Sequence, residues 1–114
     1  MVNVWRVRDN MSLDTLVTKV ENWHNDRNLI KGSTDQAQYV KLIEEAGELA
    51  GNIARGKDVR DDIGDILVVL VNIAARNGWD LYTCLKVAFD DIKDRKGCMV
   101  DGVFIKESDA SPPN

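Results

Sequence analysis

Apolar residues recur along this chain at the three- and four-residue steps of amphipathic helices, which predicts an all-α fold. The pattern is clear in residues 12–28, where apolar side chains from Leu13 to Trp23 fall on one helical face. Three further segments show the same periodicity. The predicted helices therefore span residues 12–28, 34–55, 59–77 and 80–96.

Capping signals support these limits. Ser12 or Asp14 begins the first helix, and Ser33 with Gln36 fits a capping box at the start of the second. The second, third and fourth helices are each followed by a glycine, at positions 56, 78 and 97. Glycine commonly follows the last residue of a helix, so the helix ends are also predicted.

A short β-hairpin is expected after the fourth helix. Residues 98–105 place Asp101-Gly102 between two short apolar runs, which is typical of a tight hairpin turn. A two-stranded ribbon is marginal alone, so it should pack on the helices or on another subunit. We therefore expect one domain over residues 1–107, a four-helix bundle with a C-terminal hairpin or extended tail, and a disordered tail over 108–114.

The third predicted helix is apolar on every side. Residues 66–71 read Ile-Leu-Val-Val-Leu-Val, and a helix that is apolar all round must be buried all round. Each helix of a small four-helix bundle keeps one exposed face. A second chain should therefore cover this helix, which predicts a homo-oligomer.

Composition narrows the class of protein. The net charge of −4 gives no domain-wide basic surface, which argues against nucleic acid as a partner. The first ten residues lack the apolar core of a signal peptide, and the run at 66–71 is too short to span a membrane. Two cysteines are too few for a disulfide framework. We expect a soluble, cytoplasmic protein.

Acidic residues border the apolar face of the second helix. On a helical wheel, Lys41, Glu45, Glu48 and Asn52 form one narrow stripe beside that face. Glu44 falls on the opposite, solvent-facing side. The doublet at 44–45 therefore splits, and only one of its acids lies with Glu48.

The third helix repeats this arrangement. Asp62 and Asp65 follow one edge of its apolar face, while Asp61 sits further round. If the two helices pair antiparallel, four carboxylates converge, and their repulsion calls for a cation. Mg²⁺ or Mn²⁺ suits such oxygen ligands. The alternative is that both acidic runs are ordinary solvated faces.

Basic residues gather near the end of the fourth helix. They are Lys93, Arg95, Lys96 and, beyond the turn, Lys106. One interpretation is that they complement the helix dipole and aid solubility. The other is that they hold phosphate oxygens, as a triphosphate bound at a metal site requires.

These motifs resemble those of the MazG-like, all-α nucleotide pyrophosphohydrolases, whose signature is ExxE followed after a spacer by ExxD. Glu45-Ala-Gly-Glu48 matches the first motif, and Asp62-Ile-Gly-Asp65 matches the second with aspartate in place of its glutamate. Residues 94–106 look like the ending of short MazG-like proteins that phages often encode. The resemblance covers roughly residues 12–107.

The resemblance implies Mg²⁺-dependent hydrolysis of a nucleoside triphosphate, ribo or deoxy, at the α–β bond, giving a monophosphate and pyrophosphate. The implied metal ligands are Glu45, Glu48, Asp62 and Asp65, and Mn²⁺ is a possible substitute ion. The general base would be Glu45 or else Glu44. The implied phosphate-binding residues are Lys41, Lys93, Arg95 and Lys96. Dimers, often paired into a homotetramer, are also implied, in the cytoplasm of a bacterial host if the chain is phage-encoded.

The aspartate at position 62 departs from the family pattern. Its side chain is one methylene shorter than glutamate, which predicts either binding through water or a shifted metal. Base or sugar contacts are assigned to Trp23, Asn28 and Asn72, although Trp23 also suits the core. His24, the sole histidine, is expected at the surface. A non-catalytic helical interaction protein is the alternative function.

Overall fold

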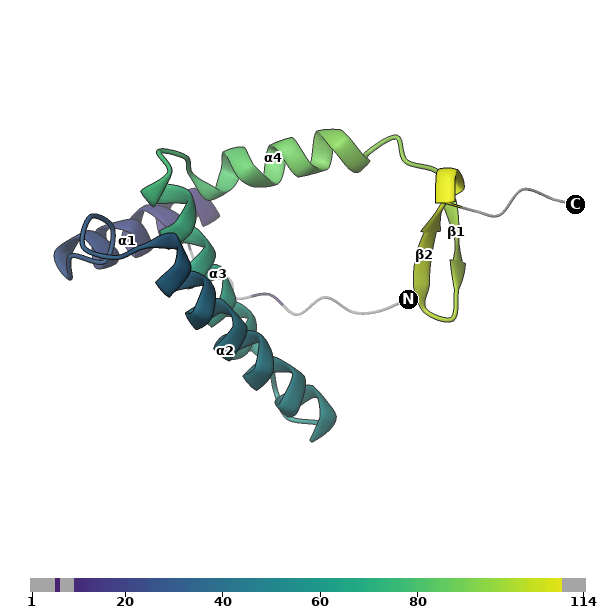
Figure 1. Ribbon diagram of the computed structural model, residues 1–114, viewed down its shortest axis with the longest axis horizontal. Helices are drawn as coiled ribbons and strands as arrows, with labels where there is room; N and C mark the ends of the chain where they lie inside the picture. The colour runs from purple at the N-terminus through teal and green to yellow at the C-terminus, as the bar shows by residue number, and fades with distance from the viewer. Residues whose placement is uncertain (1–5, 7–9, 110–114) are drawn as a thin grey trace, which may run out of the picture. The chain divides into compact units, whose positions relative to one another are not determined.

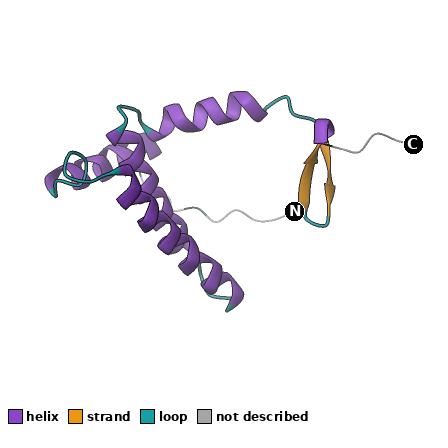
Figure 2. Cartoon of the chain, in the orientation of Figure 1, coloured by secondary structure: helices purple, strands orange, loops and turns teal. Residues whose placement is uncertain are grey.

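The computed structural model describes residue 6 and residues 10–109. Helices dominate this part of the chain, and a hairpin follows them (Figures 1 and 2). The elements in order are α1 (Leu13–Asp26), α2 (Asp35–Ala54), α3 (Arg60–Arg76), α4 (Leu81–Ile92), β1 (Gly97–Val100), β2 (Val103–Lys106) and the 3₁₀ turn η1 (Glu107–Asp109). The predicted all-α class with a C-terminal hairpin is confirmed, and the limits of α1 to α3 agree with prediction within two residues.

The chain divides into two compact units, one ending at Leu81 and the other beginning at Tyr82. The first unit holds α1, α2 and α3. The second holds the rest of α4, the hairpin and η1. The single domain over residues 1–107 therefore stays a prediction.

In the first unit, α3 is the central helix. It lies along α2, and α1 also packs against it (Figure 1). The pairing of α2 with α3 is antiparallel, because Asp35 at the start of α2 bonds Arg76 at the end of α3. The buried apolar residues of the described chain are Val69, Val71 and Ala74, all on α3. Val69 and Val71 of the apolar run at 66–71 therefore lie in the core, whereas Leu67 of the same run is 40% exposed.

Side-chain caps fix where the first two helices begin. Ser12 caps α1, with its Oγ accepting a hydrogen bond from the Thr15 amide at 3.1 Å, as predicted. The capping box at Ser33 was a wrong prediction, because α2 starts one residue later. Thr34 has the extended cap conformation and accepts from the Ala37 amide at 3.1 Å. Ser33 instead accepts a hydrogen bond from the Gln38 side chain at 3.0 Å.

In the second unit, α4 ends earlier than predicted. It stops at Ile92, and Gly97 is the first residue of β1. A Cβ at Gly97 would lie 2.1 Å from the carbonyl oxygen of Ile105, so strand pairing requires glycine there. The tight turn is confirmed, since Asp101 and Gly102 both have positive φ.

The predicted tail begins with structure. Ser108 belongs to the 3₁₀ turn η1, which corrects the expectation of disorder from that residue on. Residues 110–114 lie outside the described part of the chain. Among the described helices, none combines the length and apolar character that crossing a bilayer requires.

Candidate metal centre

Three carboxylates from α2 and α3 converge in the first unit. Glu45, Glu48 and Asp65 each place an oxygen within 4.8 Å of the other two. Glu45 is 7% exposed, whereas the side chain of Glu44 is 60% exposed. The split of the glutamate doublet predicted from the helical wheel is therefore present.

Crowding of these acids disfavours their charged forms. The negative charge of Glu45 is the main cause that raises the pKa of Glu48 above its usual value, and burial adds to it. Burial is the main cause that raises the pKa of Asp65, followed by the charges of Asp61 and Glu45. A cation placed among the three oxygens would lower the pKa values of both Glu48 and Asp65, because it favours their charged forms.

Glu45 has one oxygen paired and one unpaired. Its Oε1 lies 3.1 Å from the Nζ atom of Lys41, and this hydrogen bond is the main cause that raises the lysine pKa. Its Oε2 is buried and has no hydrogen-bond partner within the described chain. A buried, unpaired carboxylate oxygen is costly unless something binds it. Together with two neighbouring carboxylates, it is a donor set that fits Mg²⁺ or Mn²⁺.

Asp62 is buried nearby but does not join the group of three. The Nδ2 atom of Asn52 on α2 lies 3.1 and 3.0 Å from the two oxygens of Asp62. The structure thus brings together three of the four predicted ligands and pairs the fourth with an amide.

A surface cavity of about 410 Å³ adjoins the cluster. Its lining includes Asp65, Trp23 and Lys19, with Val20 and Val68. Trp23 is 45% exposed, and the Arg27 guanidinium lies 4.2 Å from its ring centroid. The indole therefore stands at a cavity wall rather than inside the core. Lys19 was not predicted as a site residue, although its position four residues before Trp23 on the same helix was a usable signal.

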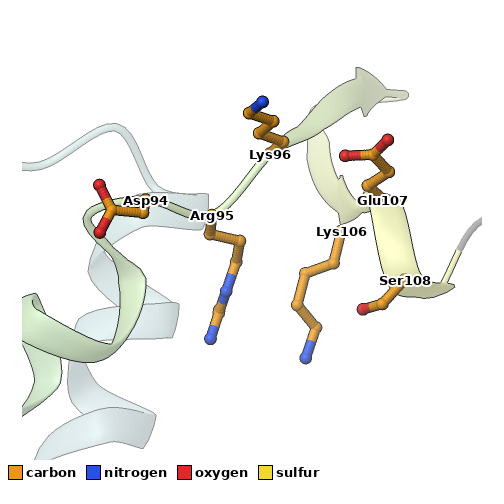
Figure 3. A pocket seen from close by; sticks show the side chains of 6 residues that line it. All are labelled: Asp94, Arg95, Lys96, Lys106, Glu107 and Ser108. Atoms are coloured by element: carbon orange, nitrogen blue, oxygen red, sulfur yellow. The ribbon is translucent and has the colours of Figure 1, made fainter.

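Of the four predicted phosphate-binding residues, Lys41 lies on α2 in the first unit, and the other three lie in the second unit. Arg95 and Lys96 line a cavity of about 560 Å³ together with Lys106, Asp94, Glu107 and Ser108. Figure 3 shows the Arg95 and Lys106 side chains extending in the same direction while Lys96 points away. Lys93 is not among the lining residues, and its Nζ atom lies 3.7 Å from Asp90.

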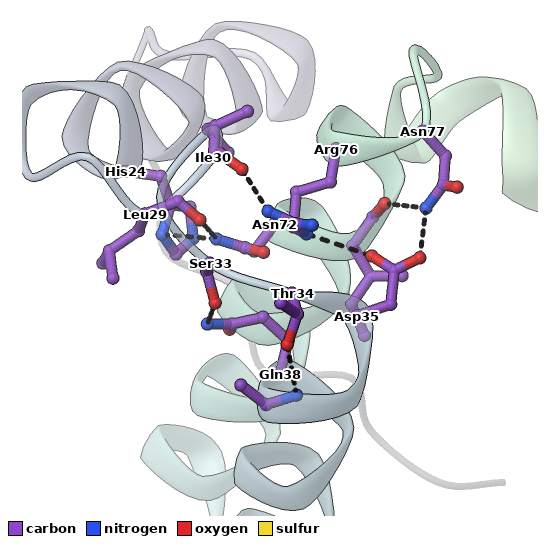
Figure 4. Close-up of polar contacts among 12 residues, drawn as sticks. His24, Leu29, Ile30, Ser33, Thr34, Asp35, Gln38, Asn72, Arg76 and Asn77 are labelled. Atoms are coloured by element: carbon purple, nitrogen blue, oxygen red, sulfur yellow. Dashed lines mark hydrogen bonds and ion pairs between the residues drawn. The ribbon is translucent and has the colours of Figure 1, made fainter.

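Asn72 is placed inside the first unit with no exposed surface. Its Nδ2 donates to the carbonyl oxygen of Leu29 at 2.9 Å and to Nδ1 of His24 at 3.3 Å (Figure 4). This position leaves no access for a ligand, so Asn72 serves the packing of α3 against the α1–α2 connection. Asn28, in contrast, is exposed on that connection, with a positive φ of 57°.

The prediction that His24 lies at the surface was wrong, because its side chain is buried. Its Nε2 donates to the carbonyl oxygen of Val68 at 2.9 Å, and its Nδ1 accepts from Asn72, so both ring nitrogens are satisfied. The signal was in the sequence: position 24 continues the apolar stripe through Val17 and Val20.

Comparison with known proteins identifies the family. Residues 33–97, more than half of the chain, match the model of the MazG nucleotide pyrophosphohydrolase domain. An uncharacterised 18.2 kDa protein from the rep-hol intergenic region of Haemophilus phage HP1 (strain HP1c1) is 44% identical over 70 residues. That match covers 60% of this chain and 43% of the phage protein, so the chain spans less than half of its relative's length. The search of solved structures found no match. The matched residues include all three clustered carboxylates. The chain belongs to the MazG nucleotide pyrophosphohydrolase family.

Proposed function

We propose that this chain is a Mg²⁺-dependent hydrolase that cleaves a nucleoside triphosphate, ribo or deoxy, between its α and β phosphates. The products are a nucleoside monophosphate and pyrophosphate. The observation that carries the proposal is the cluster of Glu45, Glu48 and Asp65, with its buried and unpaired Glu45 oxygen, in a chain of the MazG family.

Glu45, Glu48 and Asp65 would hold the metal ion through their clustered oxygens. When bound, Mg²⁺ supplies positive charge that offsets the phosphate oxygens and lowers the pKa of water. Mn²⁺ has the same preference for oxygen ligands and is proposed as its replacement. Asp62, the fourth predicted ligand, lies outside this group and is bonded to Asn52 instead.

Glu45 is the proposed general base. Its Oε1 is held by Lys41, which leaves the buried Oε2 without a hydrogen-bond partner in the described chain. A general base must lie within hydrogen-bond reach of the proton that it removes. Glu44 meets this condition less well, because its side chain is 60% exposed and lies beside Lys41, at 3.7 Å. Lys41 itself is kept as a proposed phosphate contact at this site.

The nucleoside would lie in the cavity that Trp23 and Asp65 share. The half-exposed indole offers an aromatic surface for a base, and stacking on aromatic side chains tolerates any base. Lys19, on the same wall, is available to a phosphate or a base carbonyl. Asn28 stays a proposed base or sugar contact, whereas Asn72, which has no exposed surface, is not proposed for that role.

Cations of the second unit are proposed to bind phosphate oxygens of the substrate. Arg95 and Lys96 share their cavity with Lys106, which supplies positive charge from two elements of the chain. Charge-assisted bonds from arginine and lysine are the usual grip on phosphate oxygens. Lys93 is proposed for the same task, although it lies beside Asp90 in this structure.

Product analysis tests the proposal directly. The protein is incubated with each of the common ribo- and deoxyribonucleoside triphosphates and Mg²⁺, and products are separated by anion exchange. We expect monophosphate and pyrophosphate, with a loss of about 100-fold or more in Glu48→Ala. Asp14→Asn, an exposed acid in the first turn of α1, is the matched control and should keep full activity.

Other products would contradict the proposal. Diphosphate and orthophosphate would mean that a different bond is cleaved. If no nucleotide is hydrolysed with Mg²⁺ or Mn²⁺, the non-catalytic interaction protein becomes the better interpretation.

A further inference from the structure

We propose that Asp62 is an outer carboxylate of the metal site, kept from direct contact with the ion by Asn52, which acts as its positioning residue. The inference rests on the proposed function, because it concerns the same metal site. Of the two expectations for an aspartate at this position, binding through water and a shifted metal, the inference favours binding through water.

The contact between the two side chains is tight and symmetric. The single Nδ2 atom of Asn52 lies 3.1 Å from Oδ1 and 3.0 Å from Oδ2 of Asp62. A donor that sits between both oxygens fixes the plane of the carboxylate as well as its position. Asp62 is buried, so no bulk water competes for these bonds.

Arg55 fixes the orientation of the amide. Its Nη2 donates to Oδ1 of Asn52 at 3.1 Å, which requires the amide nitrogen to face Asp62. Gly51 leaves room for this guanidinium, because a Cβ there would lie 3.1 Å from Arg55 Nη2. Hydrogen bonds therefore connect Arg55 to Asn52 at the end of α2, and Asn52 to Asp62 on α3.

Asp62 still acts on the cluster through its charge. It lies three residues before Asp65 on α3, so its carboxylate is on the same side of the helix as the cluster. Its oxygens do not join the group within 4.8 Å, so the site has three inner acids and one outer acid. An outer carboxylate of this kind attracts the cation and orients its surroundings without being a ligand, a role that commonly changes metal affinity 10- to 100-fold.

The first test counts ligands. Mn²⁺ replaces Mg²⁺, and electron–nuclear double resonance in ¹⁷O-labelled water counts the water molecules on the ion. Asp62→Asn keeps the shape and the acceptor for Asn52, and we expect an unchanged water count. Asp65→Asn, which removes an inner acid, should add one water. One added water in Asp62→Asn would show direct coordination and overturn the proposal.

The second test asks whether Asn52 acts through Asp62. We expect Asn52→Ala to weaken Mn²⁺ binding about tenfold. The same change in the Asp62→Asn background should have little further effect, because a residue that works through another loses its influence when that residue is changed. Asn52→Gln, which displaces the amide by one methylene, is the second variant should the alanine variant not fold.

A matched control separates positioning from simple structural support. Asn77→Ala removes another asparagine–aspartate bond of the same unit, the one from Nδ2 to Asp35 at 3.2 Å. It should lower the melting temperature without changing Mn²⁺ affinity. If Asn52→Ala behaves in the same way, Asn52 is only a link between helices and the proposal is wrong.

The outcomes also distinguish this inference from the proposed function. If the wild-type protein binds no Mn²⁺ and hydrolyses no nucleotide, both proposals fail. If it does both, and Asp62→Asn gains a bound water, only the outer position of Asp62 is refuted.

Discussion

At the scale of the residue, the acids of α2 and α3 oppose the metal-free fold. Glu48 and Asp65 have raised pKa values, the first chiefly through the charge of Glu45 and the second chiefly through burial. Such groups bind more protons in the folded than in the unfolded state, so stability falls as pH rises from the unfolded pKa toward the folded one. That window begins at about pH 4.

The first prediction follows from this sign. In EDTA at pH 7, Glu48→Gln should melt at a higher temperature than the wild type, because it removes one of the repelling charges. At pH 4 the difference should shrink, since Glu48 is then largely protonated. Calorimetry at the two pH values measures the effect. A variant less stable than the wild type at pH 7 would show that Glu48 supports the fold instead.

Metal binding gives the second prediction. A ligand that binds only the folded state stabilises it by about 2.7 kcal/mol at one hundred times its dissociation constant. Mg²⁺ should therefore raise the melting temperature of the wild type by several degrees, and EDTA should reverse the shift. Asp65→Asn should show a much smaller rise. An equal rise in both proteins would place the ion elsewhere.

The residues of the site were predictable where one helix defines them. The i, i+3 spacing on a helical wheel placed Glu45 with Glu48 and turned Glu44 toward solvent. The bond between Asn52 and Asp62 was not predictable, because it depends on how far α2 is shifted along α3. No pattern within a single helix contains that register.

At the scale of the element, α3 holds the start of α2 through polar bonds. Asn72 donates to the carbonyl oxygen of Leu29, and Arg76, one turn later, donates to that of Ile30 and to Asp35 at 3.0 Å (Figure 4). These bonds anchor the α1–α2 connection. They therefore set the alignment of the two helices that carry the carboxylates.

Asn72→Ala tests this anchor. The change leaves the Leu29 carbonyl and the buried His24 Nδ1 without their partner, which should cost about 2–3 kcal/mol of unfolding free energy. Urea denaturation measures it, and Mg²⁺ affinity should fall as well. Asn77→Ala removes an exposed amide at the C-terminal cap of α3, and this change should cost about 1 kcal/mol or less. Similar costs for both would mean that burial of the Asn72 network adds nothing.

The hairpin gives a prediction of its own. Gly97→Ala would bring a Cβ against the Ile105 carbonyl, so β1 and β2 should lose their pairing near Gly97 and Lys106. Loss of the cross-strand nuclear Overhauser contacts would report it. Gly47→Ala, where a Cβ meets no described atom within 4 Å, is the control and should leave the hairpin intact.

The turn of this hairpin was predictable from the sequence. The role of Gly97, the first residue of β1, was not. Asp101-Gly102 has a local signature, since both residues must adopt positive φ. In the sequence, Gly97 looks like a glycine that ends a helix, and this is the role that the pattern predicts for it. Only its pairing with Lys106 shows that the absent side chain makes room for the opposite strand.

At the scale of the whole molecule, the question is what packs against the apolar side chains of α4. Leu85, Phe89 and Ile92 follow one face of α4 and are each about half exposed or more. None of the residues of α4 is buried within the described chain. A helix of this length is marginal in water without tertiary packing. Another surface is therefore needed to hold it, in line with the oligomer expected from the sequence.

The last prediction is that a second copy provides this surface, as a dimer or a dimer of dimers. Light scattering after size exclusion should give two or four times the 12.8 kDa mass at micromolar concentration. Leu85→Glu with Phe89→Glu places two charges on the apolar face of α4 and should shift the protein toward the monomer. Lys86→Glu alters charge on the same helix at a residue that is already ion-paired with Asp90, and should leave the assembly intact. A wild-type protein that stays monomeric would mean that the apolar face of α4 is covered by its own chain.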